Sequence, residues 1–304
     1  MEMSVSDPAV RLLAIVNPAS GRGQAARRAQ VFAQAAARLG AGVTLATTAA
    51  AGDACELAAG CPADVRAIVS IGGDGTLNEI LNGLLRAGHD IPVALFPQGT
   101  ANVVARELGL PSAPEELAHV AVCGRPWPVD VGLANGRVFS LAAGVGFDAA
   151  VVRAVHENRS GAISYASYAG PMLRAFWNYP SSVPLCVRCD GETVCADARY
   201  VVIGNTGRYG GPFMITPDAT MEDGLFDLYC LRSARRRDLL AAMAGALAGG
   251  RQWERGPSVC MRGRRVEVTA VDGRAVDVQL DGDIGPALPL VCEIRPRAVR
   301  LMIP

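Results

Sequence analysis

Residues 67–85 read AIVSIGGDGTLNEILNGLL, and this segment decides the fold of the first part of the chain. The run 67–71 is apolar apart from one serine, which is typical of a strand buried inside a parallel sheet. After the glycines, the apolar residues recur at the spacing of one helical face: Leu77, Ile80, Leu81, Leu84 and Leu85. Thr76 and Glu79 have the spacing of a capping box, which predicts a helix start just after the glycines. The segment therefore predicts a strand, a glycine turn and a helix in direct succession.

Segments of the same two kinds continue on both sides of this unit. Strands are expected at 12–16, 43–47, 67–71 and 92–96. Helices are expected at 23–39, 53–59, 76–85 and from 99 to about 109. Strands that alternate with helices at this spacing predict a parallel sheet with helices on its faces. The first part, residues 1–126, is therefore predicted to be a Rossmann-like parallel α/β nucleotide-binding domain.

The pattern changes after about residue 126. Short β-rich runs, separated by glycine-containing turns, are found at 137–141, 184–188, 200–203, 225–231, 266–269 and 276–280. Helices are expected near 148–156, 164–177 and 235–248. These features predict a mainly antiparallel, β-sandwich-like second domain over residues 127–295. The C-terminal segment 296–304 is a candidate to rejoin the first domain.

The charge of the chain is balanced. It has 29 basic and 29 acidic residues among 304, so its formal net charge is zero and nothing indicates a nucleic acid or another acidic polymer as partner. All of the basic residues are arginine, and the sequence contains no lysine. Any contact from a basic side chain to a phosphate must therefore come from the planar guanidinium of an arginine.

The protein is expected to be cytoplasmic, with its nine cysteines not paired in disulfides. The start of the chain lacks the basic beginning of a secretory signal, so a disulfide framework is not expected. Cys186, Cys189 and Cys195 are the best candidates for a metal cluster, but strand positions three apart face opposite sides of a sheet. No apolar run reaches the roughly 18 residues of a membrane span. A peripheral position at the inner membrane surface remains open.

Three polar, glycine-containing turns follow strands of the predicted parallel sheet, namely 17–23, 72–75 and 97–102. Glycine lets backbone N–H groups approach an anion closely, and a helix N-terminus adds further donors. Asp74 places a carboxylate beside this phosphate cradle, where it could meet Mg²⁺ or a hydroxyl proton. A single GGDG turn is equally well explained as a tight connection with a surface aspartate. Because the carboxyl ends of parallel strands meet at one edge, three such turns favour one shared nucleotide site.

These motifs and their order resemble the diacylglycerol kinase catalytic-domain superfamily, which includes sphingosine, ceramide and bacterial lipid kinases. The first part matches through Asn17-Pro18-x-Ser20-Gly21, Gly72–Thr76 with Asn78-Glu79, and Pro97-x-Gly99-Thr100-Ala101-Asn102. The second part continues the match through the segments 130–132, 144–149, 204–211, 217–227 and 280–283. The resemblance extends over nearly the whole chain. It implies an ATP-dependent kinase that phosphorylates a lipid hydroxyl, with ATP and Mg²⁺ as cofactors.

The resemblance and the glycine turns together define a predicted ATP site. The family's ATP contacts correspond here to Asn17, Thr48, Gly72, Gly73, Asp74, Gly75, Thr76, Asn78 and Thr100. The turns add Ser20, Gly21, Arg22, Gly99 and Asn102. Arg22 is expected either to brace a phosphate or to be a solvated arginine at a helix start. Val103 stands where the family usually has an acid.

The resemblance also implies a structural Mg²⁺ and a catalytic base in the second domain. The metal corresponds to Thr220, Asp223 and Leu225, partly through backbone carbonyls. The base lies in an Asp-Gly-Glu motif of the family, which here reads Asp281-Gly282-Asp283. Asp281 is expected to polarise the acceptor hydroxyl, with Asp283 assisting and Asp74 orienting Mg²⁺ or the acceptor. Asp-Gly is also a strong hairpin turn, so a purely structural role for Asp281 stays open.

The expected partners are a lipid substrate at the membrane surface and no nucleic acid, with a homodimer as a further candidate. Two alternatives remain: a kinase of another hydroxyl, such as that of NAD, and a nucleotide or lipid sensor whose kinase site is incompetent. Two basic clusters could attract an anionic leaflet or could be solvated surface: Arg232, Arg235, Arg236 and Arg237, and Arg262, Arg264 and Arg265. The following aromatic residues could line a lipid pocket or belong to the core: Phe147, Phe176, Trp177, Phe213 and Trp253.

Overall fold

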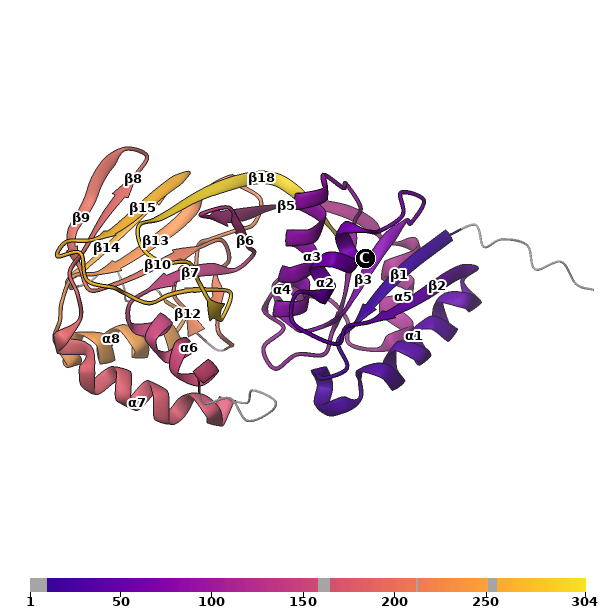
Figure 1. The fold of residues 1–304 in the computed structure, drawn as a ribbon, viewed down its shortest axis with the longest axis horizontal. Helices are drawn as coiled ribbons and strands as arrows, with labels where there is room; N and C mark the ends of the chain where they lie inside the picture. The colour runs from indigo at the N-terminus through magenta and orange to yellow at the C-terminus, as the bar shows by residue number, and fades with distance from the viewer. Residues whose placement is uncertain (1–9, 158–164, 212, 251–255) are drawn as a thin grey trace, which may run out of the picture. The chain divides into compact units, whose positions relative to one another are not determined.

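The computed structural model describes residues 10–157, 165–211, 213–250 and 256–304 (Figure 1). The chain divides into two compact units, of which the first contains residues 1–128 and 299–304 and the second residues 129–298. The boundaries expected from the sequence were 126 and 296.

The sheet of the first unit has four parallel strands in the order β2-β1-β3-β4. Their bounds are Val10–Val16 for β1, Ala41–Thr47 for β2, Ala67–Gly72 for β3 and Val93–Pro97 for β4. The end of β18 (Leu290–Ile303) lies beside β4, where Leu301 pairs with Val93 in parallel. The predicted parallel α/β domain is confirmed.

Helices cover both faces of this sheet. They are η1 (Ser20–Gly23), α1 (Ala25–Arg38), α2 (Asp53–Ala59), α3 (Asp74–Ala87), α4 (Val103–Glu107) and α5 (Pro114–Cys123). The buried faces of α1 and α5 share one apolar core with the sheet, in which the rings of Phe32 and Phe96 lie 5.8 Å apart. Figure 1 shows α2, α3 and α4 on the opposite face.

The second unit contains two packed sheets. One is antiparallel with the order β14-β13-β10-β7-β16-β17, and the other includes β18, β15, β8 and β9. The bounds are β7 Ala142–Val145, β8 Leu185–Cys189, β9 Glu192–Ala198, β10 Tyr200–Gly204, β13 Phe226–Leu231, β14 Ser258–Gly263, β15 Arg265–Ala270, β16 Val278–Leu280 and β17 Asp283–Ile284. Smaller strands are β5 Arg125–Ala134, β6 Arg137–Phe139, β11 Arg208–Tyr209 and β12 Phe213–Met214. The predicted sandwich-like domain is confirmed.

Alternation along the central strands separates two apolar cores of the second unit. On β10, Val201 and Ile203 face the core between the two sheets, whereas Tyr200 and Val202 face a second core on the outer side. Helices cover that outer side: α6 (Phe147–Glu157), α7 (Ala169–Asn178) and α8 (Arg236–Leu247), with short turns η2 (Tyr165–Tyr168) and η3 (Tyr179–Ser181). The second unit therefore has three layers: sheet, sheet and helices (Figure 1).

The sequence expectation missed several elements, including α5, β5, β7, β9, β14 and β18. The long strand β18 reads LVCEIRPRAVRLMI, in which charged residues and Pro296 interrupt the apolar alternation. Pairing with β15 and β4 makes it a strand nonetheless. Such long-range pairing leaves little trace in local sequence.

The cysteines are all free, and Cys189 and Cys195 belong to the core between the sheets. In the described ranges no group of three or more histidine, cysteine or acidic side chains is placed to hold a metal ion. No helix in these same ranges is long and apolar enough to cross a bilayer.

Candidate active site

The glycine turn after β3 leads straight into helix α3. Gly73 is the residue before the helix, and its backbone is extended (φ −97°, ψ −170°). The first bond of the helix runs from Leu77 N to Gly73 O, so the preceding N–H groups have no partner within the helix. The helix begins at Asp74, earlier than the capping-box spacing predicted, because Thr76 and Glu79 bond elsewhere. Thr76 Oγ1 accepts from Asn17 Nδ2 at 3.3 Å, and Glu79 accepts from Ala54 N at 3.2 Å.

The turns after β3 and β4 touch through their backbones. A Cβ on Gly73 would lie 3.0 Å from Gly99 Cα, and one on Gly99 would lie 2.6 Å from Gly73 Cα. Gln98 N also donates to Gly72 O at 2.7 Å. Asp74 Oδ1 accepts from Val104 N at 3.3 Å and so joins α3 to the start of α4. Glycine is required at both positions because any side chain would push the two turns apart.

The turn after β1 joins the same cluster. Asn17 donates to Thr76, and its Oδ1 accepts from Ala19 N at 3.0 Å, which holds its own turn. A Cβ on Gly21 would lie 2.8 Å from Gln98 Oε1. Ser20 lies in this turn, whereas the side chain of Arg22 lies outside the described residues. The three turns therefore do meet at the carboxyl edge of the sheet.

Not every residue of the predicted ATP site can reach a ligand in this arrangement. Thr48 is buried, and its N–H and hydroxyl both donate to Val16 O. Asn78 is buried, and its Oδ1 accepts from Asn82. Asn102 has a left-handed backbone (φ 47°) and exchanges two hydrogen bonds of 2.8 Å with Gly99. Thr48 and Asn78 therefore shape the turns from behind, whereas Asn102 is half-buried and its side chain holds the turn after β4.

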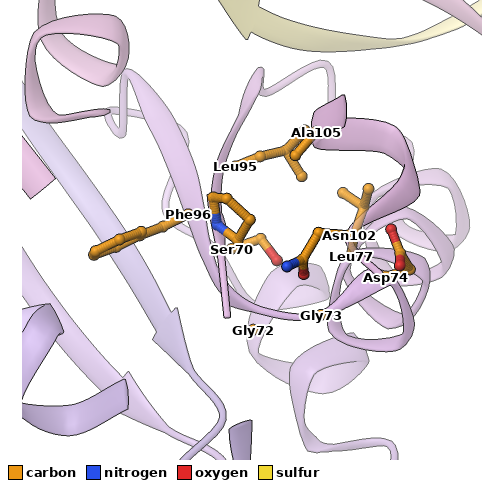
Figure 2. A pocket seen from close by; sticks show the side chains of 10 residues that line it. Ser70, Gly72, Gly73, Asp74, Leu77, Leu95, Phe96, Asn102 and Ala105 are labelled. Atoms are coloured by element: carbon orange, nitrogen blue, oxygen red, sulfur yellow. The ribbon is translucent and has the colours of Figure 1, made fainter. Parts of the chain in front are cut away.

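The accessible rim is formed by Asn17, Ser20, Gly21, Gly73, Asp74, Gly75, Gly99 and Thr100. Behind it, the recess in Figure 2 is lined by residues that include Ser70, Gly73, Asp74, Leu77 and Asn102, and its volume is about 10 Å³. Such a volume holds about one water molecule. A nucleotide at this edge would therefore lie on the rim.

Sequence reasoning missed Gln98 and Arg28 beside this rim. Gln98 is buried, and its Oε1 accepts from Arg28 Nη1 at 3.3 Å. The guanidinium of Arg28 also lies 5.0 Å above the ring of Phe96 and donates to Ser112 O. Gln98 stands inside the quoted motif at 97–102, but nothing local indicates that its side chain turns inward.

At the predicted structural metal site, the positive charge is supplied by the side chain of Arg262. Asp223 Oδ1 accepts from Leu225 N at 3.0 Å, and Oδ2 is paired with the guanidinium of Arg262. Arg262 Nε also lies 3.2 Å from Asp227 Oδ2. Burial raises the pKa of Asp227, although Arg262 acts in the opposite direction. Asp223 is the only carboxylate of the predicted set, and both of its oxygens are engaged within the protein, so Thr220, Asp223 and Leu225 in this arrangement do not fit a bound divalent cation.

We expect the melting temperature of the protein without nucleotide to be equal in Mg²⁺ and in EDTA. Arg262→Met removes the internal cation and should cost about 1 kcal/mol, because the pair is partly exposed. Mg²⁺ should restore part of the lost stability, because Asp223 and Asp227 would then lack a positively charged partner and would bind the ion. Differential scanning fluorimetry measures these shifts, and Arg264→Met is the matched control. A Mg²⁺-dependent rise in the wild type that Asp223→Ala abolishes would restore the metal site.

The loop 221–224 is anchored by a buried acid that the sequence reasoning left without a role. Asp130 is fully buried, and its carboxylate accepts from Gly224 N at 2.6 Å and from Arg297 N at 2.7 Å. Its own N–H donates to Met221 O at 2.7 Å. Asp130 therefore fixes the loop that carries Asp223 through backbone hydrogen bonds.

Asp281 is held by a dense set of donors. Its Oδ2 accepts from Ser140 N at 2.6 Å and Ser140 Oγ at 3.0 Å, and its Oδ1 accepts from Leu141 N at 2.8 Å and Ala142 N at 3.0 Å. A carboxylate offers about four acceptor positions, so these bonds occupy all of them. Asp281 and Gly282 both have positive φ, 53° and 86°, as in a two-residue type I′ hairpin. The geometry therefore matches the structural alternative for Asp281.

Asp283, the second acid of the motif, is partly exposed. It lies on β17 with its side chain 44% exposed, and its carboxylate is 3.6 Å from His156 Nε2 and 3.8 Å from Arg137 Nη2. His156 on α6 also lies 3.2 Å from Gly282 O. Sequence reasoning singled out neither His156 nor Arg137, because each comes from a segment distant in sequence.

A buried network supports this turn from below. Asp148 Oδ2 accepts from Tyr209 OH and from Gln279 Nε2, and Gln279 Oε1 accepts from Gly282 N at 2.8 Å. Burial raises the pKa of Asp148 to about 6, although these hydrogen bonds act in the opposite direction. A Cβ on Gly144 would lie 1.8 Å from this carboxylate, so glycine is required there. The network connects α6 and β16 to the Asp-Gly-Asp turn.

Comparison with known proteins covers both units. The model of the diacylglycerol kinase catalytic domain matches residues 11–134, and that of the YegS C-terminal NAD kinase beta sandwich-like domain matches residues 142–303. A diacylglycerol kinase of Mycobacterium tuberculosis is 31% identical over 304 residues, with 97% of this chain and 95% of the relative covered. A diacylglycerol kinase of Bacillus subtilis is 28% identical over 281 residues, with 90% of each covered.

A solved structure agrees with the fold. The crystal structure of a diacylglycerol kinase from Bacillus anthracis superposes with a TM-score of 0.75 at 22% identity, with 97% of each chain covered. At this identity the superposition supports the fold alone. Both domain models and the near full-length relatives agree with the order of motifs along the sequence, and the chain therefore belongs to the diacylglycerol kinase family.

Proposed function

We propose that the protein is an ATP-dependent lipid kinase that transfers the γ-phosphate of ATP to a hydroxyl of a diacylglycerol-like lipid. The observation that carries the proposal is the convergence of three strand-end turns on the N-terminus of α3, in a chain of the diacylglycerol kinase family. Phosphoryl transfer needs mainly positioning and charge stabilisation, and an anion cradle supplies both.

The backbone N–H groups at the start of α3 would hold the phosphates. They point out of a helix end, where the dipole also favours negative charge. The chain has no lysine, so no ammonium group can take the place of these donors. Mg²⁺ bound with ATP would supply further neutralisation of phosphate charge, and Asp74 at the rim is the residue that would orient it.

The proton of the acceptor hydroxyl would go to Asp283. Its side chain is exposed enough to meet a substrate, whereas every acceptor position of Asp281 is occupied. His156 and Arg137 beside it place positive or hydrogen-bonding groups near the carboxylate and would orient it. In this proposal Asp281 sets the shape of the turn that presents Asp283.

A non-lipid acceptor is the second candidate, since the model matched by the second unit is described as NAD kinase beta sandwich-like. Radiolabelled ATP should be offered with diacylglycerol, monoacylglycerol, phosphatidylglycerol, a sphingoid base, ceramide and NAD in parallel. We expect label in a glycerolipid product and none in NAD. Transfer to NAD alone would reverse the assignment. ATP binding without transfer to any acceptor would favour a sensor with an incompetent site.

A further inference from the structure

Large apolar side chains are exposed together on two helices of the second unit. On the outer side of the six-stranded sheet, α7 and α8 expose Leu173 (58%), Trp177 (57%), Leu240 (52%) and Leu247 (57%). None of the residues of α7 is buried, although its inner side packs on the core through Met172 and Phe176. Single exposed apolar residues need no explanation, but a group of this size does.

These side chains belong to one surface. Leu173 and Trp177 are four residues apart and lie on one face of α7, as Leu240 and Leu247 do on α8. Arg236 joins the two helices: its guanidinium lies 4.8 Å from the ring of Trp177 and donates to the backbone oxygens of Phe176 and Trp177. The α7–α8 face is defined here as Leu173, Trp177, Arg236, Leu240 and Leu247.

The same helices concentrate positive charge. On or next to these helices there are four positive charges and one negative charge, in a chain of zero net charge: Arg174, Arg235, Arg236 and Arg237, and Asp238. The second basic cluster differs, because Arg262 pairs with Asp223 and Asp227, and Arg265 pairs with Glu267 and Glu293. Arg232 is paired with Asp197. Uncompensated positive charge is therefore found beside the apolar side chains of α7 and α8.

We infer that the α7–α8 face docks onto an anionic lipid bilayer. Helices that lie in a membrane interface combine leucine and tryptophan with arginine, as α7 and α8 do. The tryptophan ring suits the headgroup level, and arginine can bury its stem while its guanidinium meets lipid phosphate. The inference rests on the proposed function for its purpose, because a kinase of a bilayer lipid must reach the bilayer. The binding itself is independent of ATP.

The test uses the full chain and sedimented vesicles of phosphatidylcholine, alone or mixed with phosphatidylglycerol, without nucleotide. We expect binding to the mixed vesicles that weakens with salt. Leu173→Ser with Leu240→Ser, and Arg174→Glu with Arg235→Glu, should each lower the partition coefficient at least about tenfold. The matched controls are Leu45→Ser with Val271→Ser, and Arg27→Glu with Arg38→Glu, which change exposed residues outside the α7–α8 face. They should bind like the wild type.

A second readout separates docking from catalysis. Variants of the α7–α8 face should phosphorylate lipid dispersed in detergent micelles at the wild-type rate and lose activity only on vesicles. Vesicle binding by a wild type that phosphorylates no lipid would support docking and overturn the proposed function. Equal vesicle binding by the wild type and both pairs of face variants would overturn docking and leave the kinase proposal intact. A wild type that phosphorylates lipid but does not sediment with anionic vesicles would lead to the same conclusion.

Discussion

A Gly73→Val variant is expected to lose ATP affinity by at least about a hundredfold while the protein stays folded. The residue stands at the entrance of α3, where a phosphate would have to approach the backbone N–H groups. A side chain there would occupy the approach, and its Cβ would lie 3.0 Å from Gly99 Cα, so the facing turn would also shift. Isothermal titration with a non-hydrolysable ATP analogue measures the loss.

Gly88→Val is the matched control for this change. Gly88 ends the same helix with φ 69°, and a Cβ there would meet nothing within 4 Å. Valine at positive φ costs stability, typically a few kcal/mol at most, but it leaves the phosphate end untouched. We expect Gly88→Val to lower the melting temperature and to bind ATP like the wild type. Unchanged affinity in a folded Gly73→Val protein would contradict the phosphate cradle.

The parts of this site that follow from local rules could be predicted from the sequence. Apolar periodicity located β3 and α3, and glycine located the turn between them, because both depend only on neighbouring residues. The exact start of α3 could not be predicted in the same way. Thr76 and Glu79 imitate a capping box, but their partners are Asn17 and the Ala54 N–H, on other elements of the unit.

The roles of residues whose partners lie far away along the chain could not be predicted from the sequence. Arg262 carries no motif, yet the register of β13 and β14 places it directly opposite Asp227, and its side chain also meets Asp223. The donors around Asp281 come from Ser140, Leu141 and Ala142, some 140 residues earlier in the chain. Resemblance could indicate which acids matter, but the division of work between two neighbouring acids depends on which of them the fold leaves accessible.

Asp283→Asn is expected to lower kcat by about 10²–10⁴ at an unchanged melting temperature, the usual contribution of a positioned base. Asparagine preserves size but cannot accept the proton. The carboxylate of Asp283 lies 3.6 Å from His156 and 3.8 Å from Arg137, and both pairs are partly exposed, so removing its charge should cost little stability. ATP affinity should stay the same.

Asp281→Asn should behave in the opposite way, and the pair of variants decides between the two acids. An amide in place of the carboxylate would turn its NH₂ group toward two of the donors from Ser140, Leu141 and Ala142. Loss of charge-assisted bonds and the new clash should cost about 2–4 kcal/mol and lower the melting temperature by several degrees. Activity per folded molecule, measured well below that temperature, should fall far less than in Asp283→Asn. If Asp281→Asn instead loses activity at an unchanged melting temperature, Asp281 accepts the proton as the family resemblance implies, and its donors serve to orient the base.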